Sequence, residues 1–204
     1  MKSTGMQQAW LKFMFQGVAP TLPTSPLSFA LVVAAYGSWT ASTAVATTGE
    51  LVSPTTPNGH FYELTTAGTT GTTEPVWPTA PGATVTDGTA VWTEASSLRV
   101  AGTLPEVSGG GYARATLAVS STNFPLASYT GSTYLGQKVD NGAVVSYGSG
   151  STTGNWGLIV GVMVFDSSTT PVFLGSGVFG TAVQVNSGDP FPQFPIAAMN
   201  FIEK

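Results

Sequence analysis

Few residues of this chain have the type and spacing that acid–base or nucleophilic chemistry requires. The one histidine, His60, follows an Asn-Gly pair, and there is no cysteine or second histidine to share a metal ion. No Gly-x-Ser-x-Gly elbow occurs, so a Ser-His-Asp hydrolase has no nucleophile. The ten Asp and Glu residues are scattered singly and form no pair for a glycosidase. We therefore expect a non-enzymatic protein with no catalytic residue, cofactor or metal site, and we interpret His60 as a surface loop residue.

One glycine pattern matches a cofactor motif in its letters alone. Gly175, Gly177 and Gly180 have the Gly-x-Gly-x-x-Gly spacing of a dinucleotide-binding loop. That loop needs a helix after it, whose N-terminal amides would face a pyrophosphate, and here another strand-like run follows. We interpret the match as accidental.

The composition favours a protein that assembles with neighbours. Charged residues make up only 8% of the 204, against about 25% in ordinary soluble domains. A surface of Thr, Ser, Gly and Ala can be buried against other subunits without desolvating many ions. We therefore expect self-association, with a homotrimer as the specific prediction. The net charge of −4 supplies no basic field for nucleic acid. Residues 1–17 are too polar for a membrane span and lack the small-residue cleavage site of a secretory signal, so we expect neither.

The apolar runs predict an all-β fold that begins with one short helix. Thr4 and Gln7 form a capping box and Gly17 stops the turn. One face of this helix carries Met6, Trp10, Phe13 and Met14, and we expect that face to cover the core, with docking to another subunit as the alternative. A first strand is predicted at 27–36 after a proline-rich stretch. Further strands are predicted at 112–119, 144–147, 157–165, 172–179, 182–185 and 194–202, as in an antiparallel sandwich or jelly roll.

A change in composition marks a second module at 38–97. This segment is rich in Thr, Gly and Pro, and all six basic residues of the chain lie outside it. Its acidic residues are Glu50, Glu63, Glu74, Asp87 and Glu94. We therefore expect a discontinuous host domain, 1–37 and 98–204, that carries a small inserted β module.

The host part resembles the tail-fibre-like family of tailed-phage virion structural proteins. Seven short blocks, in order along the chain, carry this resemblance. They are LPTSP (22–26), EVSGGGYAR (106–114), TNFP (122–125), NG (141–142), GNWG (154–157), VFD (164–166) and VNSGD (185–189). Family members run from the first strand to the second block through a short loop, whereas here about sixty residues intervene. The resemblance implies a protein of the virion surface that is assembled in the host cytoplasm.

The module resembles a small phage-associated relative of carbohydrate-binding domains. The blocks that carry this second resemblance are Trp39, GELV (49–52), Pro54, NG (58–59), FY (61–62), AGTTG (67–71), EPVWP (74–78) and DGTAVW (87–92). If the module binds a glycan, Trp77 and Tyr62 could stack on sugar rings while Glu74 and Asp87 accept hydroxyl hydrogen bonds. The alternative is that the aromatic residues Trp39, Tyr62, Trp77 and Trp92 form its core. We favour the core, with Trp77 as the exposed exception because two prolines flank it.

Together these observations predict an outer structural protein of a phage particle. The first hypothesis is a capsid decoration or cement protein that binds the major capsid protein or another virion protein and projects its module outward. The alternative is a tail-fibre or receptor-binding component that recognises host surface polysaccharide. A polysaccharide depolymerase is the weakest hypothesis, because catalytic residues are missing. We expect neither nucleic acid nor membrane as a partner.

Overall fold

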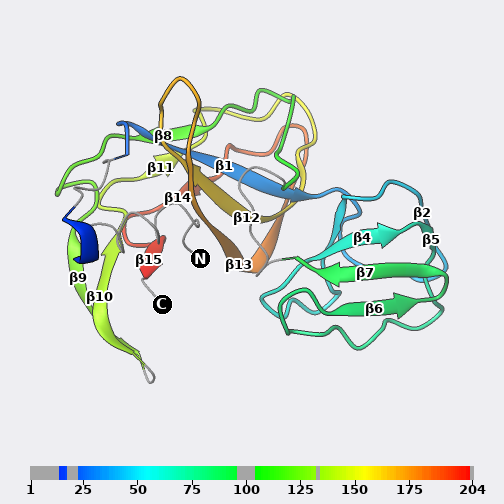
Figure 1. Ribbon diagram of the computed structural model, residues 1–204. Coiled ribbons are helices and arrows are strands. Elements are labelled where there is room, and N and C mark those ends of the chain that lie inside the picture. Colours follow the sequence, from blue (N-terminus) through cyan, green and yellow to red (C-terminus); the bar gives the residue numbers. More distant parts are fainter. Residues whose placement is uncertain (1–13, 18–22, 96–103, 132–133, 203–204) are drawn as a thin grey trace.

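The chain folds almost entirely into short antiparallel strands, which confirms the predicted all-β class. The computed structural model describes residues 14–17, 23–95, 104–131 and 134–202, and Figure 1 shows their arrangement. The expected N-terminal helix lies mostly outside the described residues. Within them, residues 14–16 form one helical turn that ends at Gly17, whose φ is +66°. Met14 is 67% exposed, so it does not cover the core as expected.

The host is built on a four-stranded sheet with the order β13-β12-β1-β8. Its strands are β13 (Phe173–Val185), β12 (Gly157–Phe165), β1 (Leu27–Ala34) and β8 (Ala115–Leu117). Strand β1 pairs antiparallel with β12, with Phe29 opposite Val164 and Ala34 opposite Leu158. The predicted strand 157–165 is β12, which lies between β13 and β1 as its apolar sequence suggested. The predicted strands 172–179 and 182–185 are one continuous strand, β13.

Strand β1 is buried on both faces, as its unbroken apolar sequence requires. Phe29 and Leu31 belong to a core between this sheet and a second layer of the host. The second layer contains β11 (Val145–Ser146) paired with β14 (Gln193–Phe194). A further sheet has the order β15-β10-β9, from Asn200–Ile202, Tyr134–Asp140 and Leu126–Gly131. The host is therefore a sandwich of antiparallel sheets.

Residues 38–95 form a separate lobe, on the right in Figure 1. Its main sheet has the order β3-β4-β7-β6, and a small sheet pairs β2 with β5. These strands are β2 (Ala44–Val45), β3 (Leu51–Val52), β4 (Tyr62–Thr66), β5 (Gly68–Thr69), β6 (Thr84–Asp87) and β7 (Ala90–Glu94). A core of its own contains Tyr62, Leu64 and Trp92.

The lobe and the host also share a core. Leu51 and Phe61 of the lobe are buried in one cluster with Ala30 and Val32 on the second face of β1. A backbone hydrogen bond also crosses this junction, because the Tyr36 N–H donates to the Leu51 carbonyl at 3.0 Å. The lobe thus covers a face of the central host strand, and its stability is coupled to that of the host.

This coupling predicts different effects for two equally buried leucines. Leu51→Ala and Leu64→Ala should each lower the free energy of unfolding by about 2 to 5 kcal/mol, as core Leu→Ala changes do. Leu51 lies in the shared core and Leu64 in the lobe's own core. In native-state hydrogen exchange, Leu51→Ala should therefore speed amide exchange in β1 and β12. Leu64→Ala should instead speed amide exchange mainly in β4 and β7. Unchanged protection of β1 in Leu51→Ala would show that the host folds without the lobe.

Candidate functional site

The aromatic residues of the lobe form a cluster in which Trp77 packs against both Tyr62 and Trp92 and reaches the surface. The Tyr62 and Trp77 ring centroids are 4.4 Å apart at 32°, and the Trp77 and Trp92 centroids are 6.3 Å apart at 64°. Tyr62 and Trp92 are fully buried, whereas Trp77 is half-buried. Trp77 is thus the most exposed of the three rings, as its neighbouring prolines suggested, and Val76 beside it is 93% exposed.

Asp87 is buried beside Trp92 of this cluster. Its Oδ2 atom accepts hydrogen bonds from the indole nitrogens of Trp39 at 2.8 Å and Trp92 at 3.1 Å. Its Oδ1 atom accepts one from the Gly71 N–H at 2.7 Å. The carboxylate therefore fixes two core tryptophans, and a hydrogen-bonded buried carboxylate of this kind stabilises the fold. The expectation that Asp87 and Tyr62 face a glycan does not fit this burial.

Glu74 lies beside Trp77 at the surface of the lobe. Its Oε1 atom accepts hydrogen bonds from the Trp77 indole nitrogen at 2.8 Å and from the Thr55 N–H at 2.9 Å. The Thr55 hydroxyl donates to Oε2. Partial burial alone would raise the pKa of Glu74, but the hydrogen bonds from Thr55 and Trp77 outweigh it and hold the pKa below the usual value. Thr55 was not foreseen as a site residue, because it lies nineteen positions from Glu74.

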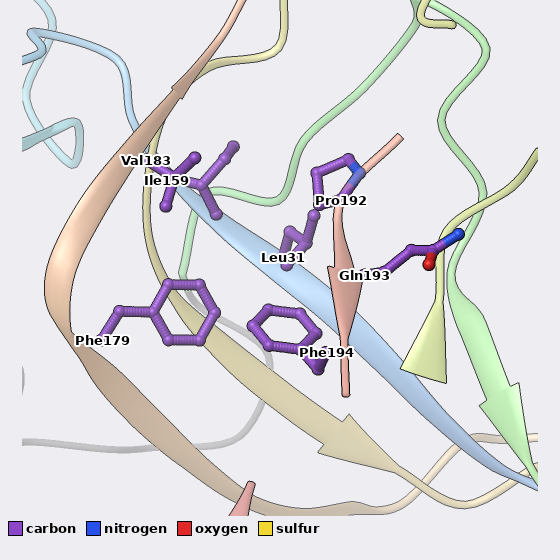
Figure 2. A pocket seen from close by; sticks show the side chains of 7 residues that line it. All are labelled: Leu31, Ile159, Phe179, Val183, Pro192, Gln193 and Phe194. Atoms are coloured by element: carbon purple, nitrogen blue, oxygen red, sulfur yellow. The ribbon is translucent and has the colours of Figure 1, made fainter. Parts of the chain in front are cut away.

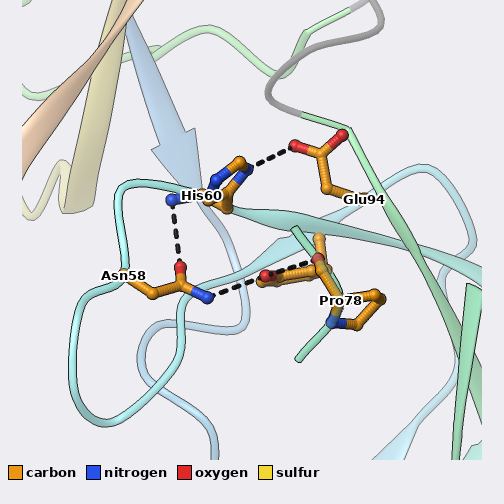
Figure 3. A network of polar contacts seen from close by, with 5 residues as sticks. Asn58, His60, Pro78 and Glu94 are labelled. Carbon is orange, nitrogen blue, oxygen red and sulfur yellow. Dashed lines mark hydrogen bonds and ion pairs between the residues drawn. The ribbon is translucent and has the colours of Figure 1, made fainter. Parts of the chain in front are cut away.

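A polar network, shown in Figure 3, holds the loop that carries Trp77. Asn58 donates from Nδ2 to the Tyr62 hydroxyl at 2.9 Å, and this hydroxyl donates to the Pro78 carbonyl at 3.0 Å. The loop is thus fixed to β4 directly after Trp77. Burial raises the pKa of Tyr62, the Asn58 hydrogen bond lowers it and the charge of Glu94 raises it further.

His60 has a different position from the one expected. Its side chain is only 22% exposed, and its Nδ1 atom lies 2.9 Å from Oε1 of the buried Glu94. Its backbone N–H donates to the Asn58 Oδ1 at 3.0 Å. His60 therefore belongs to the packed structure of the lobe rather than to a free surface loop.

In the host, the two ends of the sequence block 106–114 meet around Glu106. Arg114 donates to both oxygens of this carboxylate, from Nε at 2.8 Å and from Nη2 at 2.6 Å. The Tyr112 hydroxyl donates to Glu106 at 2.9 Å and accepts the N–H of Leu31, on β1, at 2.9 Å. The block 106–114 thus satisfies a backbone donor of the central strand. A second block, 154–157, is linked to it at Gly110, whose carbonyl accepts from the Trp156 indole nitrogen at 3.1 Å.

Close packing explains why two of these glycines are required. A Cβ atom on Gly110 would lie 2.9 Å from the Gly154 carbonyl oxygen and from Trp156, and Gly110 also has a positive φ of +57°. A Cβ atom on Gly142 would lie 1.9 Å from the Thr122 carbonyl oxygen. Sequence blocks that are far apart along the chain therefore contact one another in the fold, and their glycines allow the close approach of these segments in the host.

The described part of the chain has neither a cluster of metal ligands nor a membrane-spanning helix. Among residues 14–17, 23–95, 104–131 and 134–202, no three His, Asp or Glu side chains lie close enough together to hold a metal ion. In the same part of the chain no helix is both long and apolar enough to cross a membrane.

The lowered pKa of Glu74 predicts how the site responds to acid. Its carboxylate stabilises the folded state above the pKa of the unfolded chain, about 4.3, and this contribution is lost as the pH falls through the lower folded pKa. Between about pH 5 and pH 3, Glu74→Gln should therefore lose less stability than the wild-type protein. Thermal unfolding at several pH values measures this, with Glu63→Gln on β4 as the control. Parallel pH curves for the wild-type protein and Glu74→Gln would contradict the charge-assisted contact.

The comparison with known proteins identifies the family. The family model described as Podophage GP4 fiber I protein gp80 matches residues 79–201, which is more than half of the chain. The matched region starts just after Trp77, includes β6 and β7 of the lobe and continues through the six host sequence blocks between 106 and 189, but not the block at 22–26. No curated protein sequence matches the chain. A phage fibre family implies a structural protein of the virion, and this chain belongs to the family described as Podophage GP4 fiber I protein gp80.

Proposed function

We propose that this protein is a non-enzymatic component of a phage tail fibre, with residues 38–97 forming a module that faces away from the particle. The observation that carries the proposal is the match of residues 79–201 to a podophage fibre family. The low charge supports it, since a surface with few ions can be packed against other fibre subunits. The position of the lobe at one end of the molecule leaves the rest of the host free for assembly (Figure 1).

Capsid decoration is the second candidate, and the shape of the molecule favours it. The described residues form a compact sandwich and one lobe, with no repeated unit of the kind that builds a long shaft. A cement protein would bind the major capsid protein through the host and project the lobe. We rank the fibre first, because the family name specifies a fibre and the sandwich fits either location.

Recognition of host polysaccharide is the role we propose for the lobe, at Trp77 and Glu74. The Trp77 ring is backed by Tyr62 and fixed through its indole nitrogen, so it is a rigid, partly exposed surface on which a sugar ring could stack. The adjacent Glu74 carboxylate could accept a sugar hydroxyl. This is a smaller site than the four residues considered from the sequence.

Self-association is the other part of the proposal. We propose a homotrimer that contacts further virion proteins. Because only 8% of the residues are charged, few ions must lose their hydration when subunits pack together. Large apolar residues are exposed in the host, among them Leu126 at 70% and Ile196 at 62%. Such residues are more stable when a neighbouring subunit covers them.

Antibody labelling of intact particles tests the location. Gold-conjugated antibodies against the purified protein should label the tail fibres in electron micrographs of the virion. Labelling spread over the capsid shell would support decoration in place of the fibre. Particles that carry no label, while the same antibody detects the protein in a particle digest, would show that it is not at the surface.

Substitution of Trp77 tests glycan recognition. Trp77→Ala should abolish binding to polysaccharide extracted from the bacterial host, and it should destabilise the lobe by less than the roughly 3 to 5 kcal/mol of a fully buried aromatic residue. Val76→Ala, a change at the highly exposed neighbour, is the matched control and should leave binding and stability unchanged. Binding is measured by calorimetry below the unfolding temperature of each variant. Equal binding by Trp77→Ala and the wild-type protein would eliminate this site.

A further inference from the structure

The chain contains two Asn-Gly pairs, Asn58-Gly59 in the lobe and Asn141-Gly142 in the host. Asparagine deamidates readily before glycine, because glycine has no side chain to hinder attack by its backbone nitrogen on the preceding side-chain amide. The two pairs have the same residues, so a difference in their reactivity must come from the fold around them.

The host core closes Asn141 to this reaction. Its side chain is fully buried, its Nδ2 atom donates to the Pro195 carbonyl at 2.8 Å, and its Oδ1 atom accepts the Met199 N–H at 2.8 Å. The nitrogen that would attack, that of Gly142, donates to the Asn123 carbonyl at 2.7 Å. Hydrogen bonds therefore hold both the amide and its attacking nitrogen inside the protein.

Opening of this site would disturb the main core of the host. Pro195 directly follows Phe194 of β14, and Figure 2 shows the Phe194 ring facing Phe179 beside the buried Leu31 and Ile159. The centroids of the two phenylalanine rings are 5.2 Å apart. A buried site reacts only in molecules whose fold has opened around it, and core contacts make such opening rare. Asn141 is therefore an internal reference for the other pair.

The Asn58-Gly59 pair lies at the surface of the lobe, where both residues are exposed. A Cβ atom on Gly59 would meet nothing within 4 Å, and in the part of the chain that the structure describes its N–H has no hydrogen-bond acceptor. The Asn58 Oδ1 atom accepts the His60 N–H at 3.0 Å. This donor would stabilise the negative charge that develops on Oδ1 when the amide carbon is attacked.

We propose that Asn58 is a spontaneous modification site, at which deamidation forms aspartate and isoaspartate in the loop that holds Trp77. The deprotonated Gly59 nitrogen attacks the side-chain carbonyl carbon of Asn58, forms a C–N bond and expels the amide nitrogen as ammonia. Water then opens the resulting succinimide ring at either of its carbonyl groups. The net reaction consumes water and releases ammonia, so it requires no enzyme or cofactor.

Figure 3 shows the contacts that this modification would change. Asn58 Nδ2 donates to the Tyr62 hydroxyl at 2.9 Å, and this hydroxyl donates to the Pro78 carbonyl, directly after Trp77, at 3.0 Å. A carboxylate at position 58 has no donor, and it accepts the hydroxyl hydrogen more strongly than a neutral carbonyl does. The hydroxyl therefore turns from Pro78 to the new carboxylate, and the Trp77 loop loses its direct contact with β4. An effect on polysaccharide binding rests on the proposed role of Trp77, whereas the modification itself does not.

Peptide mass spectrometry of the full-length protein, incubated in mildly alkaline buffer, tests the modification. Asn58 should convert at least about tenfold faster than Asn141, because Asn141 reacts only after local opening. In protein unfolded by urea the two pairs should convert at similar rates, which shows that the fold causes the difference. Conversion of Asn58 no faster than that of Asn141 in the folded protein would overturn the site.

The variant Asn58→Asp carries the carboxylate from the start and tests the effect on the Trp77 loop. Its backbone amides in residues 74–80 should exchange hydrogen several-fold faster than those of the wild-type protein. Asn155→Asp is the matched control in the host. Asn155 is also exposed, and its Oδ1 atom accepts the Ser187 N–H at 2.8 Å, a contact that aspartate retains. This control should leave exchange in 74–80 unchanged.

The outcomes separate this inference from the proposed function. Faster exchange in Asn58→Asp together with weaker binding of host polysaccharide supports both. Faster exchange with unchanged binding supports the loosening of the loop and contradicts the proposed role of Trp77. Unchanged exchange in 74–80, in both Asn58→Asp and deamidated wild-type protein, would overturn the effect on the loop.

Discussion

The structure depends on burial of both faces of β1, the central host strand. One face, with Phe29 and Leu31, packs on the second layer of the sandwich, and the other, with Ala30 and Val32, packs on the lobe and the end of the host sheet. Its backbone donors must then be satisfied inside the protein, because no water reaches them. The segment around Glu106 provides this: Val33 N–H donates to the Pro105 carbonyl, and Leu31 N–H donates to the Tyr112 hydroxyl. The sequence blocks that resemble the phage family therefore serve the core directly.

This architecture separates the two roles that we propose. The lobe begins where β1 ends, and its aromatic cluster holds Trp77, with Glu74 beside it, at the surface of that lobe. The β9–β10 hairpin lies at the other end of the molecule (Figure 1). A subunit built in this way can be held by its neighbours through the host while the lobe remains accessible. The shared core around Leu51 and Phe61 keeps the two parts mechanically connected, so forces on the lobe reach the sandwich.

The all-β class and the central position of 157–165 could be predicted from the sequence, because an apolar run flanked by glycine and polar turns has few other solutions. The exposure of Trp77 could be predicted from its two prolines. The burial of Asp87 could not, because its indole partner Trp39 is forty-eight positions away. The hairpin at 126–140 could not be predicted either, since apolar and polar residues do not alternate along it as they do in a strand with one face on a core. Strand 112–119 is shorter than predicted, because Tyr112 and Arg114 turn to Glu106 instead of extending the ladder.

We propose that this chain is a structural subunit at the surface of a phage tail. Reconstruction of the intact virion by cryo-electron microscopy tests it most directly, because the sandwich with its lobe has a distinctive outline. We expect density of this shape in the tail fibre, in rings of touching host domains with the lobes outward. Density of this shape on the capsid shell, or its absence from a particle shown by mass spectrometry to contain the protein, would show that the chain is not a surface subunit of the tail.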